Sequence, residues 1–283
     1  MMNSFSLNRF WNTLCWVLAV NFRTMLMWTA GSAVGAFLFE TVYMTMDNGT
    51  TYLQSLNSMS SFITFLVVLA IVIGLSSIFV GINKKPRREA FLMLPSSDLE
   101  KFLASVIFVT IVWPVCVFLA FAVGDTIRMV VGSLVYEESW ISCIWQVSER
   151  LIPIDMRAAT HMPYSMLYIT MLNVSFLGFL LWVHSVYILG GTLLRRYSFV
   201  VSSLLWMFVA ILFIWAVDRY ELSFFNTQWE NNVLVSFDVG FWGYAVSVVL
   251  PLLAVFNYWM SFRIFKGFQL ITNKWTNYDI LKR

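Results

Sequence analysis

The residues best suited to chemistry or to binding lie together in one polar stretch, Asn83–Lys101, which reads NKKPRREAFLMLPSSDLEK. Pro86 suits the first turn of a helix, whereas Pro95 disfavours helical geometry at the residue before it. Ser97 followed by Glu100 matches a capping box, in which each side chain accepts a hydrogen bond from the backbone N–H of the other residue. The stretch is therefore predicted to form a short helix, a sharp turn and the capped start of a second helix.

The middle of this stretch is apolar and needs a partner. Residues 90–94, AFLML, would be costly to leave in water. A helix resting on anionic lipid would cover them, with the basic pairs at 84–85 and 87–88 facing the headgroups. A helix docked on a cytosolic protein would cover them equally well. The residues alone leave both interpretations open.

Three ionisable residues lie within or beside long apolar runs: Glu40, Asp125 and His184. Such residues are candidates for a functional site because their burial in a membrane is costly. Glu40 and Asp125 are expected either to line a polar vestibule or to pair with Arg128, and an interfacial location without a function is favoured for Asp125. For His184 we favour a neutral imidazole that a neighbouring helix satisfies, and the alternative is a polar residue of a transport pathway.

The sequence contains no recognisable catalytic or metal-binding set. GxxxxGK[ST], HExxH and GxSxG motifs do not occur. Two histidines are too few for a histidine-rich metal site, and three cysteines lie far apart without a CxxC pair. We therefore expect a chain that is not an enzyme and holds no cofactor or metal ion. Nucleic acid is not an expected partner, because basic residues beside apolar spans set membrane topology first.

These polar residues are set in a chain of 283 residues that is 60% hydrophobic and 12% charged, with a mean hydropathy of +0.77. A soluble domain has about 45–50% apolar and about 25% charged residues, so this composition indicates a membrane protein. Continuous apolar runs favour helices over a barrel. We predict one all-α membrane domain over residues 1–283. Its six transmembrane helices are expected at residues 25–45, 62–82, 102–123, 166–189, 199–217 and 239–262.

The basic residues determine the expected orientation. With a cytoplasmic N-terminus, every Lys and Arg falls on the cytoplasmic side except Arg128, Arg150, Arg157 and Arg219. The positive-inside rule favours this arrangement, and six spans then place the C-terminus in the cytoplasm as well. Residues 84–101 become a cytoplasmic connection, and residues 126–162 become the longest outer segment.

Residues 4–22 are expected to form a separate helix before the first span. Apolar side chains recur there at helical spacing, while Asn8 and Arg9 favour the opposite side. This pattern is typical of a helix that lies in the cytoplasmic membrane interface, in contact with lipid. An extended first span is the alternative interpretation.

The first span carries a GxxxG motif at Gly31 and Gly35. Two glycines one turn apart let a second helix backbone approach closely, which is a main packing device between helices in a membrane. Packing within the chain and packing between subunits both fit the motif.

The sequence RREAFLMLPSSDLEK resembles the coupling-helix region of ABC-2 type permeases, the membrane subunits of many bacterial ABC transporters. In that family a charged stretch leads into an apolar L-x-x-L-P element, a small residue and a polar pair follow, and the third span comes next. The general layout of the chain is also similar to the family. The resemblance implies that an ABC ATPase docks on Arg87, Arg88, Glu89, Phe91, Leu92, Leu94, Pro95, Ser97, Asp98 and Glu100.

The resemblance further implies that the chain is half of a translocation unit. A second copy or a paralogue would complete the pathway, and two ATPase subunits would bind ATP and Mg²⁺. Gly31 and Gly35 would lie at the interface between permeases, with Glu40 and His184 as polar candidates for the pathway. The expected substrate is an exported amphipathic or hydrophobic molecule, and the expected location is the inner (plasma) membrane. In many relatives the largest outer elements lie between spans five and six, whereas here the longer one follows span three.

Two other classes of function compete with transport. A membrane scaffold or accessory subunit would share the docking segment but would need no pathway. A membrane enzyme would need clustered Asp, Glu, His, Ser or Cys on several spans, and the predicted spans hold few such groups.

Overall fold

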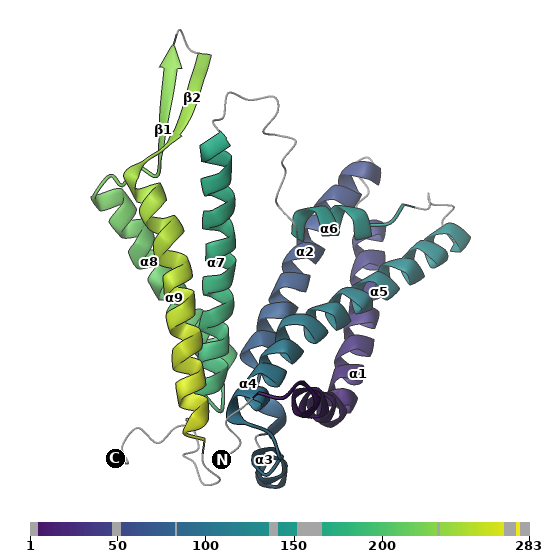
Figure 1. The fold of residues 1–283 in the computed structure, drawn as a ribbon. Helices are drawn as coiled ribbons and strands as arrows, with labels where there is room; N and C mark the ends of the chain where they lie inside the picture. Colours follow the sequence, from purple (N-terminus) through teal and green to yellow (C-terminus); the bar gives the residue numbers. More distant parts are fainter. Residues whose placement is uncertain are drawn as a thin grey trace. The chain divides into compact units, whose positions relative to one another are not determined.

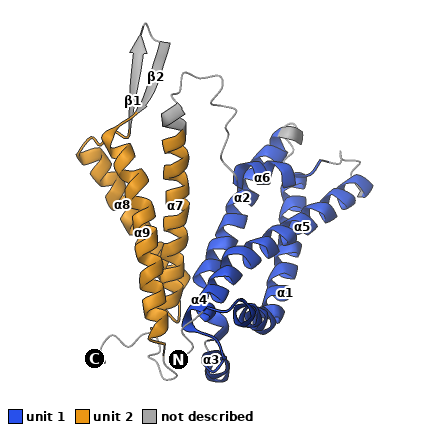
Figure 2. Ribbon diagram, in the orientation of Figure 1, with its two compact units in different colours: residues 1–153 blue, residues 154–283 orange. Residues whose placement is uncertain are grey.

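The computed structural model describes residues 5–46, 52–82, 84–135, 141–151, 166–230, 233–268 and 276–277. The chain divides into two compact units, residues 1–153 and 154–283, which Figure 2 colours blue and orange. Within the described residues, six helices are long and apolar enough to cross a membrane: Leu7–Met46, Gln54–Ser76, Asp98–Leu134, Thr170–Leu193, Ser198–Arg219 and Phe241–Lys266. The prediction of six helices of spanning length is confirmed, and the chain has the build of a multi-pass membrane protein.

The surfaces of these helices carry large apolar side chains with little to cover them. Leu204, Phe208, Ile211 and Ile214, for example, are each more than half exposed along one helix. Contiguous apolar surface of this kind is rare on soluble proteins and is stable against lipid or another apolar surface. The exposure pattern therefore agrees with the composition.

Unit 1 begins with α1, Leu7–Met46, a continuous helix where two elements, 4–22 and 25–45, were predicted. Neither glycine nor proline occurs between Leu7 and Thr29, so nothing in the local sequence breaks the helix. Figure 1 shows the first turns of α1, in dark purple, running in a different direction from the rest of the helix. The change of direction is thus made without a loop.

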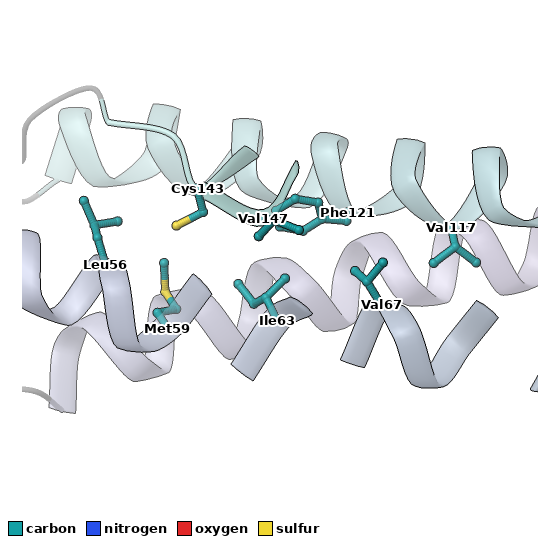
Figure 3. Packing of buried hydrophobic residues seen from close by; sticks show 8 residues of the cluster. All are labelled: Leu56, Met59, Ile63, Val67, Val117, Phe121, Cys143 and Val147. Atoms are coloured by element: carbon teal, nitrogen blue, oxygen red, sulfur yellow. The ribbon is translucent and has the colours of Figure 1, made fainter. Parts of the chain in front are cut away.

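The core of unit 1 lies between α2, Tyr52–Ser76, α5, Trp113–Val135, and the short helix α6, Ile144–Leu151. Figure 3 shows the side chains of α2 facing those of the other two helices. The spacing of three and four residues places each helix's contributors on one face. The cluster consists of Leu56, Met59, Ile63, Val67, Val117, Phe121, Cys143 and Val147.

This core explains why α2 begins earlier than predicted. The predicted span started at Phe62, because the preceding run, YLQSLNSMSS, is rich in polar residues. Leu56 and Met59 within that run are fully buried in the core, so tertiary packing extends the helix. At its other end α2 stops at Ser76, before the predicted Ile82, and a single 3₁₀ turn follows at Val80–Ile82.

The third spanning helix has a wider turn in its middle. It begins as α4, Asp98–Ile107, passes through a π-helical stretch, Phe108–Val112, and continues as α5. Pro114 lies just beyond this stretch and lacks the N–H that an α-helix needs, which is a common setting for a local change of helix type. A proline inside a long apolar helix is expected to disturb it, and in this helix the disturbance takes the form of the π-helical stretch.

The wide turn presents Trp113 to α2. Its indole Nε1 donates a hydrogen bond to the carbonyl of Ala70 at 2.9 Å. A Cβ added at Gly74 would lie 2.0 Å from the indole ring, so the ring occupies the space that glycine leaves. Gly74 is therefore required for this contact between α2 and α5.

The segment predicted as outer loop, 126–162, is partly helical. α5 continues to Val135, beyond the predicted end at Val123, and α6 lies within the same segment. The continuation is possible because Asp125 and Arg128, which favoured a loop by their polarity, are both buried and hydrogen-bonded. Residues 141–143 lead into α6, and residues 136–140 and 152–162 of this segment lie outside the described ones.

The described part of unit 2 consists of three helices and a hairpin. The helices are α7, Met166–Leu193, α8, Ser198–Arg219, and α9, Phe241–Lys266, and α7 packs along α9. The strands β1, Phe225–Glu230, and β2, Val233–Val239, pair in antiparallel fashion, with Phe225 opposite Val239. The helical class predicted from the sequence is confirmed, and the hairpin is an addition to it: residues between spans five and six alternate polar and apolar side chains, a pattern with strand periodicity.

Candidate functional site

The 84–101 segment forms the short helix and turn that the sequence predicted. Helix α3, Lys85–Leu92, has Pro86 in its first turn and ends before Pro95. The N–H of Met93 donates to the carbonyl of Glu89 at 2.9 Å, and the N–H of Ser96 donates to the carbonyl of Leu94 at 2.8 Å. These bonds close the end of the helix and tighten the turn that follows.

The capping box is present. The N–H of Glu100 donates to Ser97 Oγ at 3.3 Å, and the N–H of Ser97 donates to Glu100 Oε2 at 2.7 Å. Both bonds satisfy donors that the start of α4 would otherwise leave open. The prediction from these two residues is confirmed.

Glu100 has further partners that the local sequence did not indicate. Its Oε1 accepts hydrogen bonds from the backbone N–H of Ser6 at 2.7 Å and from Arg9 Nη2 at 3.1 Å. The same carboxylate therefore caps α4 and binds the beginning of α1. Since its side chain is fully buried and meets several donors, Glu100 joins two elements that lie more than ninety residues apart in sequence.

Part of α3 faces the chain itself. The ring of Phe91 is buried against Trp16, with ring centroids 5.5 Å apart, and Arg88 is buried as well. The ammonium of Lys101 donates to the carbonyl of Leu92 at 2.8 Å, which ties the end of α3 to α4. These groups act as anchors of the segment.

The rest of the segment is open to its surroundings. Met93 is 79% exposed, and Lys85 pairs only loosely with Glu89, at 3.9 Å. The predicted docking residues are therefore divided by the structure. Arg87, Pro95 and Asp98 are exposed, Glu89, Leu92, Leu94 and Ser97 are half-buried, and Arg88, Phe91 and Glu100 are buried.

The GxxxG motif has free space around it. A Cβ added at Gly31 or at Gly35 would meet no atom within 4 Å. The close approach between α1 and α5 uses another glycine, Gly124, whose added Cβ would lie 2.7 Å from the carbonyl oxygen of Ala33. Gly35 instead borders an open, mostly apolar groove of 280 Å³ lined by α1, α2 and α5. Among the described residues of unit 1, the motif is not used for packing.

Glu40 and Asp125 both pair with Arg128. Arg128 Nε lies 3.1 Å from Glu40 Oε2, and its Nη2 lies 2.9 Å from Asp125 Oδ1. All three side chains are buried, so neither carboxylate lines a vestibule in unit 1. The pairing that the sequence offered as one of two alternatives is confirmed for both residues. The interfacial location without a function that we favour for Asp125 stays a prediction.

His184 has a partner on the neighbouring helix. Its Nδ1 lies at hydrogen-bonding distance, 2.5 Å, from the hydroxyl oxygen of Tyr258 on α9. Asn257 Nδ2 donates to Ser185 Oγ at 3.0 Å next to it. Polar side chains thus meet between α7 and α9, as we expected for a histidine satisfied by a neighbouring helix.

The described part of the chain contains no group of His, Cys, Asp and Glu arranged to hold a metal ion. No family model, no curated protein and no solved structure matches this chain. The class that the structure supports is a helical, multi-pass membrane protein, and its function has to be inferred from the sites above.

Proposed function

We propose that this chain is the permease subunit of an ABC transporter, driven by a separate ATPase that docks on the 84–101 segment in the cytoplasm. The observation that carries the proposal is the division within this segment. Phe91 and Glu100 are held inside the chain, whereas Arg87 and Met93 face outward. A docking element has to be held by contacts with the rest of the chain, because a flexible loop would not transmit the partner's movement to the membrane helices.

The anchors of the segment also supply a route for that movement. Phe91 contacts Trp16 of α1, and Glu100 binds both Arg9 of α1 and the start of α4. A force applied to α3 would therefore reach two long helices through side chains rather than through flexible backbone. This is the arrangement that a lever between an ATPase and a membrane domain requires.

Other features are compatible with a complete transporter. The open face at Gly31 and Gly35 is available for a second copy or a paralogue of the chain. Two ATPase subunits would bind ATP and Mg²⁺, and the substrate would be an exported amphipathic or hydrophobic molecule. The distribution of Lys and Arg supports cytoplasmic termini. The apolar spacing at the start of α1 supports an interfacial position there, and the resemblance to ABC-2 permeases supports the inner (plasma) membrane.

A non-transporting scaffold is the second candidate function. The same surface at Arg87 and Met93 would hold an ATPase or an anionic lipid surface without any pathway. This candidate requires association with the partner but no dependence of ATP hydrolysis on a substrate.

The test uses the full chain, purified under mild conditions after co-expression with the proteins encoded beside it. Met93→Asp and Arg87→Glu change the exposed surface of the segment and leave its anchors in place. Trp145→Asp is the matched control, because Trp145 is 71% exposed but belongs to α6. We expect both segment variants to lose ATPase association at least tenfold and the control to keep it, with unchanged unfolding midpoints in all three.

Association that survives Met93→Asp and Arg87→Glu would contradict the docking assignment. Equal loss with Trp145→Asp would point to a general defect instead. If association depends on the segment but no amphipathic compound changes the rate of ATP hydrolysis, the scaffold function is favoured. If both variants lose binding to anionic vesicles and no ATPase copurifies with the unchanged chain, the segment rests on lipid.

A further inference from the structure

The carboxylate–arginine cluster, formed by Glu40, Asp125 and Arg128, holds two acids against one base. Asp125 is saturated with donors: Oδ1 accepts from Arg128 Nε at 3.2 Å and Nη2 at 2.9 Å, and Oδ2 accepts from Ser142 Oγ and from the N–H of Cys143 at 3.1 Å. Every one of these contacts suits an ionised carboxylate, since all four are donors. Asp125 is thus the acid that balances the guanidinium.

Glu40 meets fewer hydrogen-bond donors than Asp125. Its Oε2 accepts one bond, from Arg128 Nε at 3.1 Å, and its Oε1 is buried without any donor. Glu40 and Asp125 meet the same nitrogen, because Arg128 Nε also donates to Asp125 Oδ1 at 3.2 Å. Among the described residues, Arg128 is the one cation in contact with either acid.

Two buried acids that share one cation do not both ionise readily, because like charges in a poorly solvated site repel strongly. A proton on one of the two carboxyl groups removes this repulsion. We propose that the cluster is a proton-binding site, in which Glu40 is a neutral carboxylic acid and Asp125 is ionised.

The assignment of the proton to Glu40 follows from the partners. A proton on Asp125 would compete with four donors, whereas a proton on Glu40 meets no donor on Oε1. The proton then acts between helices, because Glu40 belongs to α1 and Asp125 to α5. Its release would leave two negative charges across the contact that Gly124 makes with Ala33, and would weaken the packing of α1 on α5.

The test compares two isosteric variants of the full chain in lipid nanodiscs. Glu40→Gln preserves the shape and the donor of a neutral acid, whereas Asp125→Asn removes the charge that balances Arg128. We expect Glu40→Gln to keep the thermal unfolding midpoint of the unchanged chain and Asp125→Asn to lower it by several degrees. Infrared spectra at neutral pH should contain the carbonyl band of a protonated carboxylic acid, and Glu40→Gln should remove that band.

Glu89→Gln is the control for the spectrum, because Glu89 is half-exposed and its substitution should leave the acid band unchanged. The proposal is overturned if the unchanged chain has no acid band, or if Glu40→Gln leaves the band in place. It is also overturned if Glu40→Gln lowers the midpoint as much as Asp125→Asn, the result expected of an ionised Glu40 that binds a cation. Since the infrared comparison needs only Glu40→Gln, a failure of Asp125→Asn to fold does not affect it.

Discussion

Helix α1 takes part in two ion pairs that each contain a buried glutamate, one near each of its ends, and the two glutamates differ in how many hydrogen-bond donors they meet. Near its start, Arg9 of α1 meets Glu100 of α4, and the N–H groups of Ser6 and Ser97 complete the carboxylate's partners. Near its other end, Glu40 meets Arg128, and one carboxylate oxygen receives no donor. The first site is saturated, whereas the second has an excess of acid.

The difference shows that burial of a glutamate does not by itself define its state. A buried carboxylate is stable as an ion when enough donors replace its water, and Glu100 has them from three residues, Ser6, Arg9 and Ser97. Glu40 shares Arg128 with Asp125, and Asp125 receives more hydrogen-bond donors. One site therefore works as a fixed joint between α1 and α4, and the other as a site that takes up a proton.

The largest expected effect is the loss of the cation at the second site. Arg128→Met would leave Asp125 and Glu40 buried together without compensation, which costs about 3–5 kcal/mol in comparable sites. The free energy of unfolding in mixed micelles measures the loss. Arg150→Met is the control: Arg150 binds Ser61 and Asn57 at a more exposed position, and its loss should cost about 1 kcal/mol. Equal effects of the two variants would contradict the comparison.

The second-largest effect is expected at the site of Arg9 and Glu100. Glu100→Gln removes the charge that Arg9 and two backbone N–H groups bind, and should lower the free energy of unfolding by about 2–3 kcal/mol. Glu89→Gln, which breaks only the exposed pair with Lys85, should cost about 0.5 kcal/mol. Unfolding of both variants in the same micelles measures the two losses of free energy and their ratio. A loss from Glu100→Gln no larger than that from Glu40→Gln would erase the distinction between the sites.

The smallest effect separates the local part of the first site from the long-range part. Ser97→Ala removes one half of the capping box and should cost about 1 kcal/mol, leaving the bonds from Arg9 and Ser6 to Glu100 in place. Ser96→Ala is the neighbouring control, because Ser96 Oγ is buried without a partner and its removal should cost nothing. The same unfolding measurement applies, and a loss from Ser96→Ala as large as that from Ser97→Ala would contradict the assignment of the cap.

Much of the local structure could be predicted from the sequence. The capping box at Ser97 and Glu100, the first turn of α3 at Pro86 and the six apolar helices are governed by residues within a few positions of each other. The π-helical stretch next to Pro114 likewise depends on a residue close by in the sequence. Such features follow from backbone hydrogen bonding and from the cost of placing polar groups in lipid, and both are properties of short segments.

Element boundaries were predicted less well where tertiary contacts override local polarity. The polar start of α2 is helical because Leu56 and Met59 enter the core, and α5 continues past Asp125 because Arg128 and Ser142 satisfy it. The hairpin of β1 and β2 was also missed, although its alternating side chains carried a signal.

The sequence alone determined that this is a helical membrane chain and that its 84–101 segment is a helix, a turn and a capped helix. Only the tertiary structure decided which of those residues remain free to bind a partner. Phe91 had an apolar side chain in need of cover, and Trp16 of α1 provides it. Likewise, Glu40 and Arg128 lie far apart in the chain, so their pairing depends on the packing of α1 against α5. Hydrogen bonds between residues close in sequence determine where the helices begin and end. Packing between distant segments determines which side chains and charges stay exposed and can bind a partner.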